Sequence, residues 1–259
     1  MRSQKQPEKE QFVIDLQSRL LETVEDLAAE SLTTGARYIP AVVRSYHTGK
    51  LLLVRPDAGS VKPLRKGRKG QKLSTVRFSA LYPVDTKDWL DGLGEKAGGF
   101  NRSHCVISLL LDWFGISPFG DVFALNPANV HKDWGAVSAQ TSSSNRIKSS
   151  YTCQARFMKL LRKAAGPDPE QQYMRRVLAC YATGQEHAFR PDQGTFKPLA
   201  RSRKADGFET ETLGFYFGPE LVQWVDELGA RAGGFNRSHV MTLLFLDWLH
   251  INPFTEIRL

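Results

Sequence analysis

The chain has 259 residues, of which 41% are hydrophobic and 24% are charged, a composition that excludes a disordered or fibrous protein. No apolar run reaches the roughly 18 residues of a membrane helix, and the first residues lack the apolar stretch of a signal peptide, so we expect a cytoplasmic protein that binds no membrane. The 35 Lys and Arg against 27 Asp and Glu give a net charge of +8, which attracts polyanions in general, while three cysteines without CxxC spacing argue against a disulfide framework or a zinc site.

An internal repeat organises the chain. The eight residues AGGFNRSH at 97–104 recur letter for letter at 232–239. A gapless shift of 135 positions then makes 32 of 74 residues identical between 46–119 and 181–254. We therefore predict two repeat units, 1–124 and 125–259, that pack about a pseudo-twofold axis as two subunits would.

Each unit opens with a predicted helical region, at 10–60 in the first unit and 146–195 in the second. Within these regions, 11–30 and 151–165 have the apolar spacing of a helix and contain no Pro or Gly. The motif RPDxG[ST] ends both regions and is typical of a turn. Its repetition suggests a docking role, for which the sequence names no partner.

A basic arm follows each helical region, at 62–72 and at 197–204. A run of charge is usually a solvated face, but both units keep this run at the same place. Pro and Gly make the arms extended, which suits contact with a polyanion. Their cations are Lys62, Arg65, Lys66, Arg68 and Lys69, and Lys197, Arg201, Arg203 and Lys204.

One short strand follows each arm, at 75–82 and at 210–217. Apolar residues alternate in both segments, which indicates a strand with one buried face. A single strand in each unit makes no sheet. We therefore expect these two strands to pair with each other and form one two-stranded ribbon.

Two predicted helices complete each unit. The first opens beside Pro83 or Pro219, and the glycine pairs 98–99 and 233–234 supply the positive φ angles that end it. The second opens at Asn101 or Asn236, residues that cap helices well, and is apolar almost all round. We expect the second helices to form the buried centre.

The segments 73–119 and 208–254 resemble the ribbon-helix-helix (MetJ/Arc-type) DNA-binding family in a tandem, single-chain form. The order of strand, helix and Asn-Arg-Ser opening a second helix carries this resemblance, over about 45 residues in each copy. It implies a mainly α fold with a small two-stranded antiparallel ribbon. The fold would be an internally duplicated ribbon-helix-helix pseudo-dimer in which both segments form one composite DNA-binding domain, plus a helical region from each repeat.

The resemblance also implies two kinds of DNA contact. The outward strand positions would read bases in the major groove, and the free amides at the second-helix N-termini would bind phosphates. The simpler alternative is that Asn-Arg-Ser only caps the helix. The implied base readers are Arg77, Ser79, Leu81, Thr212, Gly214 and Tyr216, and the implied phosphate ligands are Asn101, Arg102, Ser103, Asn236, Arg237 and Ser238.

We expect a nucleoid-associated, double-stranded-DNA-binding transcriptional regulator of the repressor kind, with its basic arms on the DNA backbone or in the minor groove. Alternatives are an accessory DNA-binding protein of plasmid transfer, partition or transposition, or a protein-interaction scaffold that has lost specific DNA reading and binds a protein through 1–60 and 146–195. Self-association on adjacent sites stays open. With no Gly-rich phosphate loop, nucleophile elbow or zinc motif, we expect no enzyme activity, catalytic residue, metal or cofactor.

Overall fold

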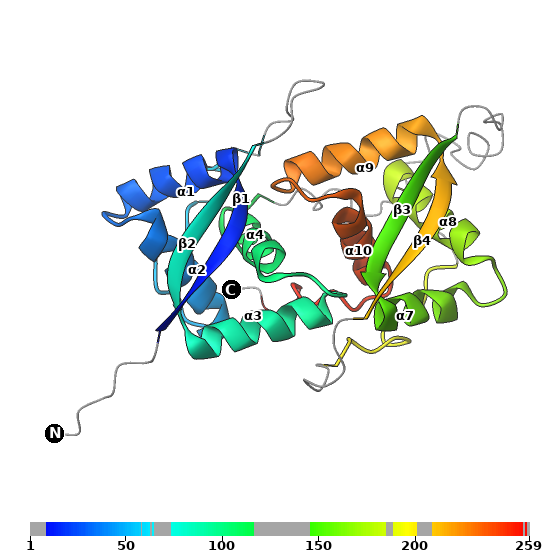
Figure 1. The fold of residues 1–259 in the computed structure, drawn as a ribbon, viewed down its shortest axis with the longest axis horizontal. Coiled ribbons are helices and arrows are strands. Elements are labelled where there is room, and N and C mark those ends of the chain that lie inside the picture. Colours follow the sequence, from blue (N-terminus) through cyan, green and yellow to red (C-terminus); the bar gives the residue numbers. More distant parts are fainter. Residues whose placement is uncertain are drawn as a thin grey trace. The chain divides into compact units, whose positions relative to one another are not determined.

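The computed structural model describes residues 9–57, 59–62, 64, 74–116, 146–184, 189–200, 209–255 and 257 (Figure 1). These residues fall into two compact units. The first lies within residues 1–94, 100–116 and 254–259, and the second within 95–99 and 117–253. The predicted boundary between 124 and 125 lies outside the described residues.

Each unit repeats the order strand, helix, helix twice (Figure 1). The elements of the first unit are β1 (Lys9–Gln17), α1 (Ser18–Glu30), α2 (Gly35–Thr48), β2 (Thr75–Pro83), α3 (Val84–Lys96) and α4 (Arg102–Trp113). Those of the second are β3 (Ile147–Gln154), α7 (Ala155–Ala165), α8 (Glu170–Thr183), β4 (Thr210–Phe217), α9 (Pro219–Arg231) and α10 (Arg237–Trp248). The described chain is thus mainly helical with two small sheets.

The strand pairing corrects the expected single ribbon. β1 pairs antiparallel with β2, and β3 pairs antiparallel with β4. Val13 lies opposite Ser79 at the middle of the first sheet, and Ser150 lies opposite Gly214 in the second. The expected pairing of 75–82 with 210–217 is wrong, because each unit contains a second strand that the sequence analysis assigned to a helix.

The predicted helices at 11–30 and 151–165 each begin with strand residues. β1 covers the first seven residues of one segment, and the end of β3 covers the first four of the other. The pattern in β1 has period two, because Phe12, Ile14 and Leu16 are buried and the residues between them are exposed. The helical spacing belongs only to α1 and α7, where the buried residues recur every three or four positions.

The second helices lie at the centre of their units, as predicted. Trp113 in α4 and Trp248 in α10 are fully buried, as are most of their apolar neighbours. Each indole N–H donates a 3.0 Å hydrogen bond to the hydroxyl of a buried tyrosine, which is Tyr38 in the first unit and Tyr173 in the second. The glycine pairs after α3 and α9 have φ between 76° and 101°, which confirms their expected turn role. No helix in the described part is long and apolar enough to cross a membrane.

Candidate nucleic-acid interface

Each sheet buries one face on the helices of its own unit and exposes the other. Apolar side chains alternate with exposed ones along all four strands, so the exposed positions of each sheet share one surface. The six predicted base readers all occupy exposed positions. They lie on two separate sheets, three on β2 and three on β4.

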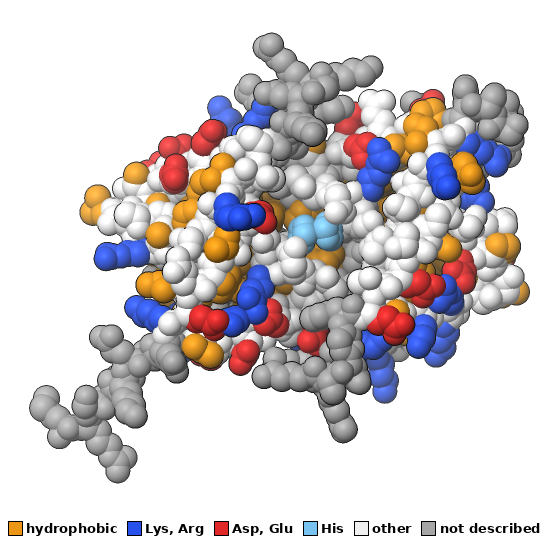
Figure 2. Space-filling view, viewed as in Figure 1, with side chains coloured by type: hydrophobic (Ala, Val, Ile, Leu, Met, Phe, Trp, Pro, Cys, Tyr) orange, Lys and Arg blue, Asp and Glu red, His pale blue; other side chains and the backbone are white. Residues whose placement is uncertain are grey.

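The exposed face of the β3–β4 sheet consists mainly of small, polar side chains and contains no carboxylate. Thr152 and Thr212 face each other across the sheet with their hydroxyl oxygens 2.9 Å apart. Lys148 lies opposite Tyr216, whose side chain is half exposed. In Figure 2 the surface over β3 and β4 is mostly white, since Ser, Thr and Gly fill its centre.

The exposed face of the first unit is more apolar and has internally paired charges. Arg77 Nε lies 3.6 Å from Oδ1 of Asp15, the residue opposite it on β1. The Gln11 amide donates a 2.5 Å hydrogen bond to the Ser79 hydroxyl. Leu81 is 56% exposed on the same face. Arg77, one of the six implied base readers, therefore has an acidic partner.

The N-termini of α4 and α10 are built alike. Asn101 and Asn236 accept a hydrogen bond from the backbone amide three residues later, at 3.0 Å, which confirms their cap role. The hydroxyl of Ser103 accepts from the backbone amide of Asp15 at 3.0 Å, and Ser238 accepts from Thr152 at 3.1 Å. These bonds hold each helix N-terminus against the outer edge of β1 or β3.

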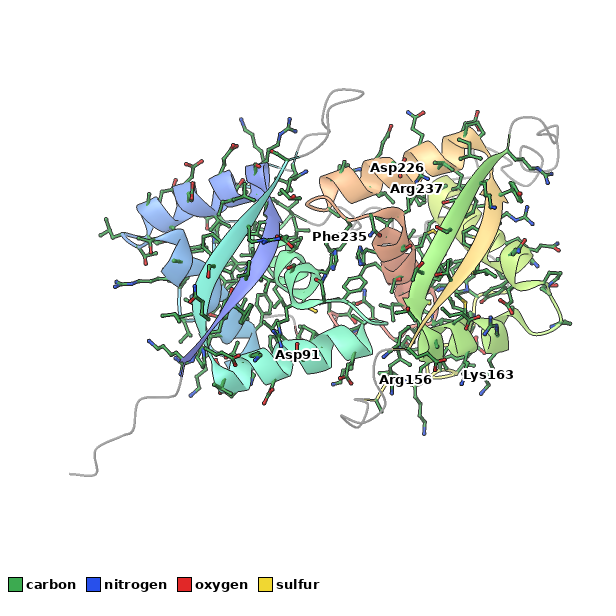
Figure 3. The ribbon with its side chains drawn as sticks, viewed as in Figure 1. Asp91, Arg156, Lys163, Asp226, Phe235 and Arg237 are labelled. Atoms are coloured by element: carbon green, nitrogen blue, oxygen red, sulfur yellow. The ribbon has the colours of Figure 1, made fainter. Side chains whose placement is uncertain are left out.

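The arginines of both Asn-Arg-Ser motifs bind a carboxylate of the preceding helix. Arg237 makes two hydrogen bonds to Asp226, of 2.6 and 2.7 Å, and Arg102 makes two to Asp91, both of 2.7 Å (Figure 3). These bonds raise the pKa of both arginines. Helix capping alone does not need this arginine, but joining the two helices does.

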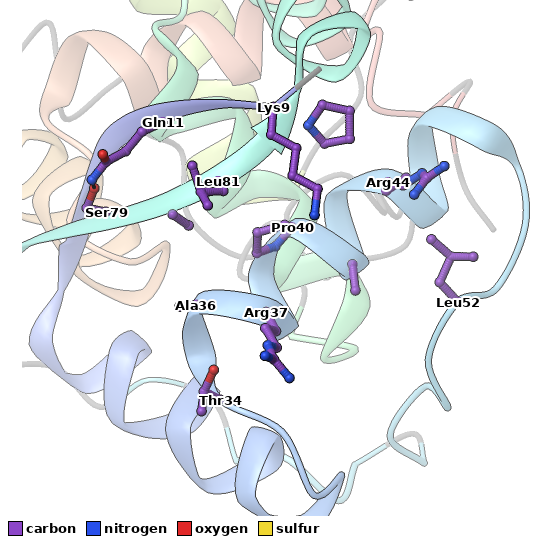
Figure 4. A pocket seen from close by; sticks show the side chains of 13 residues that line it. Lys9, Gln11, Thr34, Ala36, Arg37, Pro40, Arg44, Leu52, Ser79 and Leu81 are labelled. Carbon is purple, nitrogen blue, oxygen red and sulfur yellow. Dashed lines mark hydrogen bonds between the residues drawn. The ribbon is translucent and has the colours of Figure 1, made fainter. Parts of the chain in front are cut away.

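Hollows lie beside both sheets. In the first unit a hollow of about 680 Å³ separates the end of β2 from α2, and Lys9, Arg37 and Arg44 surround its apolar floor (Figure 4). In the second unit a hollow of about 540 Å³ lies between β3 and the start of α10, lined by Lys148, Ser149, Ser150, Gly214, Asn236, Arg237 and Ser238. Among the residues that the structure describes, no carboxylate lines either one.

The basic arms are described only at their first residues. Lys62 and Lys197 are exposed. The other predicted arm cations, Arg65, Lys66, Arg68, Lys69, Arg201, Arg203 and Lys204, lie outside the described residues. The arms therefore stay a prediction, anchored by their place directly before β2 and β4.

Half of each exposed face comes from strands that the sequence did not predict. The residues that β1 contributes are Gln11, Val13 and Asp15, and β3 contributes Lys148, Ser150 and Thr152. The alternation of Phe12, Ile14 and Leu16 could have revealed β1. The repeat alignment could not have revealed β1 or β3. Because α7 has 11 residues and α1 has 13, the gapless shift of 135 positions aligns β1 with β3 two residues away from their true correspondence.

The sequence motif RPDxG[ST] has a structural role. Its arginines, Arg55 and Arg190, bind Asp112 and Asp247 near the ends of α4 and α10.

A search of protein-family models, curated proteins and solved structures finds no match to the chain.

Proposed function

We propose that this chain binds double-stranded DNA through the exposed faces of its two-stranded sheets and acts as a transcriptional regulator. The resemblance to ribbon-helix-helix proteins then applies to each unit separately, and not to the two units together. In that family two chains each supply one strand and two helices. Here each unit would be the equivalent of a whole dimer, because it contains strand, helix, helix twice.

One observation carries the proposal: among the described residues of each unit, two antiparallel strands form a two-stranded sheet with one buried and one exposed face. A two-stranded ribbon of this kind fits the major groove, where base edges can be told apart. The packing of α2 on α4 and of α8 on α10 supports it, since the second helices of the family cross beneath the ribbon. The hollows with basic linings would face the flanking phosphates.

A second candidate is a protein-binding role for the first unit. Val13 and Leu81 are 50% and 56% exposed on its sheet, beside the paired charges of Asp15 and Arg77. Exposed apolar side chains around an ion pair suit a protein surface better than a nucleic acid.

A titration tests DNA binding directly. Fluorescence anisotropy of labelled duplexes, first a randomised library and then the sequences that the chain selects from it, should give affinity that falls as salt rises. Selected sequences should bind more tightly than the starting library. Absence of binding at low salt, or binding that salt leaves unchanged, would remove the proposal.

A further inference from the structure

We propose that the sheet of β3 and β4 is the base-reading surface of this protein and that Lys148 is its main base contact, taking a guanine. This inference rests on the proposed function. It assigns the reading to one of the two sheets and to a residue outside those singled out by the sequence.

Charge distinguishes the two sheets. The only carboxylate within β3 and β4 is that of Glu211. Glu211 belongs to the face of the sheet opposite the exposed one, where it accepts hydrogen bonds from Arg162. On the first sheet Asp15 lies within the exposed face and opposite Arg77. A carboxylate held in the groove is repelled by phosphates and can accept a hydrogen bond only from a base amino group. The second sheet therefore has the lower electrostatic cost in the groove.

Shape favours the same sheet. Its central pair is Ser150 opposite Gly214, whereas the central pair of the first sheet is Val13 opposite Ser79. A Cβ added at Gly214 would meet no atom of the described residues within 4 Å, so this part of the surface is open. A glycine at this place allows the backbone to approach the base edges closely.

Further cations lie near the Lys148 end of the sheet. Arg146 directly precedes β3. Burial, followed by the charge of Arg146, lowers the pKa of Arg175 in α8. Positive charges gathered at one end of a sheet attract a polyanion to that end. Lys148 itself lines the hollow that reaches Arg237 at the start of α10. The Lys148 ammonium can thus approach a base edge while Arg146 and Arg237 lie toward the phosphates of the DNA backbone.

Side-chain chemistry predicts what the sheet reads. The Lys148 ammonium only donates, and the guanine edge offers two acceptors, O6 and N7. Tyr216, directly opposite Lys148, suits contact with a thymine methyl group. The hydroxyls of Ser150, Thr152 and Thr212 can donate or accept and so discriminate weakly. We expect a selected site with a conserved guanine beside a thymine and weaker preferences next to them.

Three matched charge variants test the role of Lys148. Lys148→Met and Arg77→Met remove one cation from each sheet, and Lys159→Met removes one from the exposed side of α7. The sequence preference of each full-length variant would be measured by selection from the randomised library. We expect Lys148→Met to reduce the preference for guanine about tenfold or more, and by more than Arg77→Met does. Lys159→Met, which lies outside both sheets, should keep it.

The outcomes separate the inference from the proposed function. Loss of the guanine preference in Arg77→Met, with Lys148→Met unchanged, overturns the assignment to the second sheet. Binding without any base preference also overturns it but leaves DNA binding intact. No binding by the wild-type chain removes the proposed function itself.

A steric pair tests the same assignment without changing charge. Gly214→Val fills the centre of the second sheet, and Ser79→Val changes the residue at the corresponding place in the repeat of the first. Valine favours strands and has open space at Gly214, so urea unfolding should show stability retained. We expect affinity for the selected duplex to fall about tenfold or more in Gly214→Val, and by less in Ser79→Val. An equal or larger loss in Ser79→Val contradicts the proposal.

Discussion

Tyr181, Arg190 and Asp247 form a cluster near the end of α10. The tyrosine hydroxyl donates a 2.6 Å hydrogen bond to the Asp247 carboxylate, and Arg190 Nη2 binds the same carboxylate at 3.2 Å and the backbone carbonyl of Asp247 at 3.1 Å. Burial, followed by the Asp247 charge, raises the pKa of Tyr181. The cluster ties the RPDxG[ST] segment to the central helix, which accounts for the repetition of that motif.

The two copies of this cluster differ in exposure, and this difference predicts different stability losses. The Arg190 and Asp247 side chains are 12% and 17% exposed, against 32% and 38% for Arg55 and Asp112. Arg190→Ala leaves a nearly buried carboxylate without its cation and should cost about 2–4 kcal/mol. Arg55→Ala should cost about 1 kcal/mol. Urea unfolding monitored by tryptophan fluorescence measures both, and equal losses would argue against burial as the cause.

His239 in the first turn of α10 predicts a pH dependence. Burial lowers its pKa from 6.5 to about 4, so the folded chain favours the neutral imidazole. This contribution to the free energy of unfolding is complete above pH 6.5 and is lost as the pH falls through about 4. We expect the urea midpoint to fall over this interval and to fall less in His239→Gln. Parallel curves for the two proteins would show that other groups cause the decrease.

At the scale of elements, the sheets rest on pairing within each unit. Val13 lies opposite Ser79 on the exposed face of the first sheet, and residues directly opposite each other are close enough for a disulfide. The native cysteines are buried, and burial raises the pKa of Cys153 and Cys180 to about 12. They should therefore not compete for the oxidant.

An engineered disulfide tests the pairing. Val13→Cys with Ser79→Cys should cross-link under mild oxidation, as seen by altered mobility on a non-reducing gel and by peptide mass spectrometry. Ser79→Cys with Gly214→Cys joins the strands whose pairing the sequence favoured and is the matched control. Cross-linking of the control alone would restore the single composite ribbon.

Local signals predicted most of the second half of each unit. The strands at 75–82 and 210–217, the helices after them, the glycine turns and the Asn101 and Asn236 caps all lie where the sequence placed them. They could be predicted because period, turn glycines and caps act within a few residues. β1 and β3 were missed because each continues directly into a helix with no Gly or Pro between them. The two-residue period of the strand and the 3.6-residue period of the helix were therefore taken together as one helical pattern.

At the scale of the whole molecule, the basic arms predict the salt dependence of DNA binding. Replacing Arg65, Lys66, Arg68 and Lys69 by Gln removes four positive charges. If each neutralises one phosphate, the slope of log affinity against log salt should become shallower by about 3 to 4, because each contact contributes about 0.9. The sequence preference should stay unchanged, since phosphate contacts carry no base information.

Replacing four exposed cations elsewhere provides the control for this measurement. Lys50, Lys96, Lys159 and Arg231 lie in or beside helices of the described chain, outside both arms in the sequence. Gln at these positions gives the same net charge as the arm variant. An equal change of slope in the two variants would show that only the net charge matters.

The sequence by itself determined the two-unit repeat, the helix caps, the turns and the alternation of the later strands, all of which depend on neighbouring residues. Only the tertiary structure decided which strands pair, and hence that the described part of the chain has two sheets where one was expected. Main-chain hydrogen bonds are the same for any two strands, so the partner is chosen by which apolar faces can be buried together. In each unit, the apolar faces of both strands are buried on that unit's own helices, and this leaves two separate polar faces, each with its own chemistry.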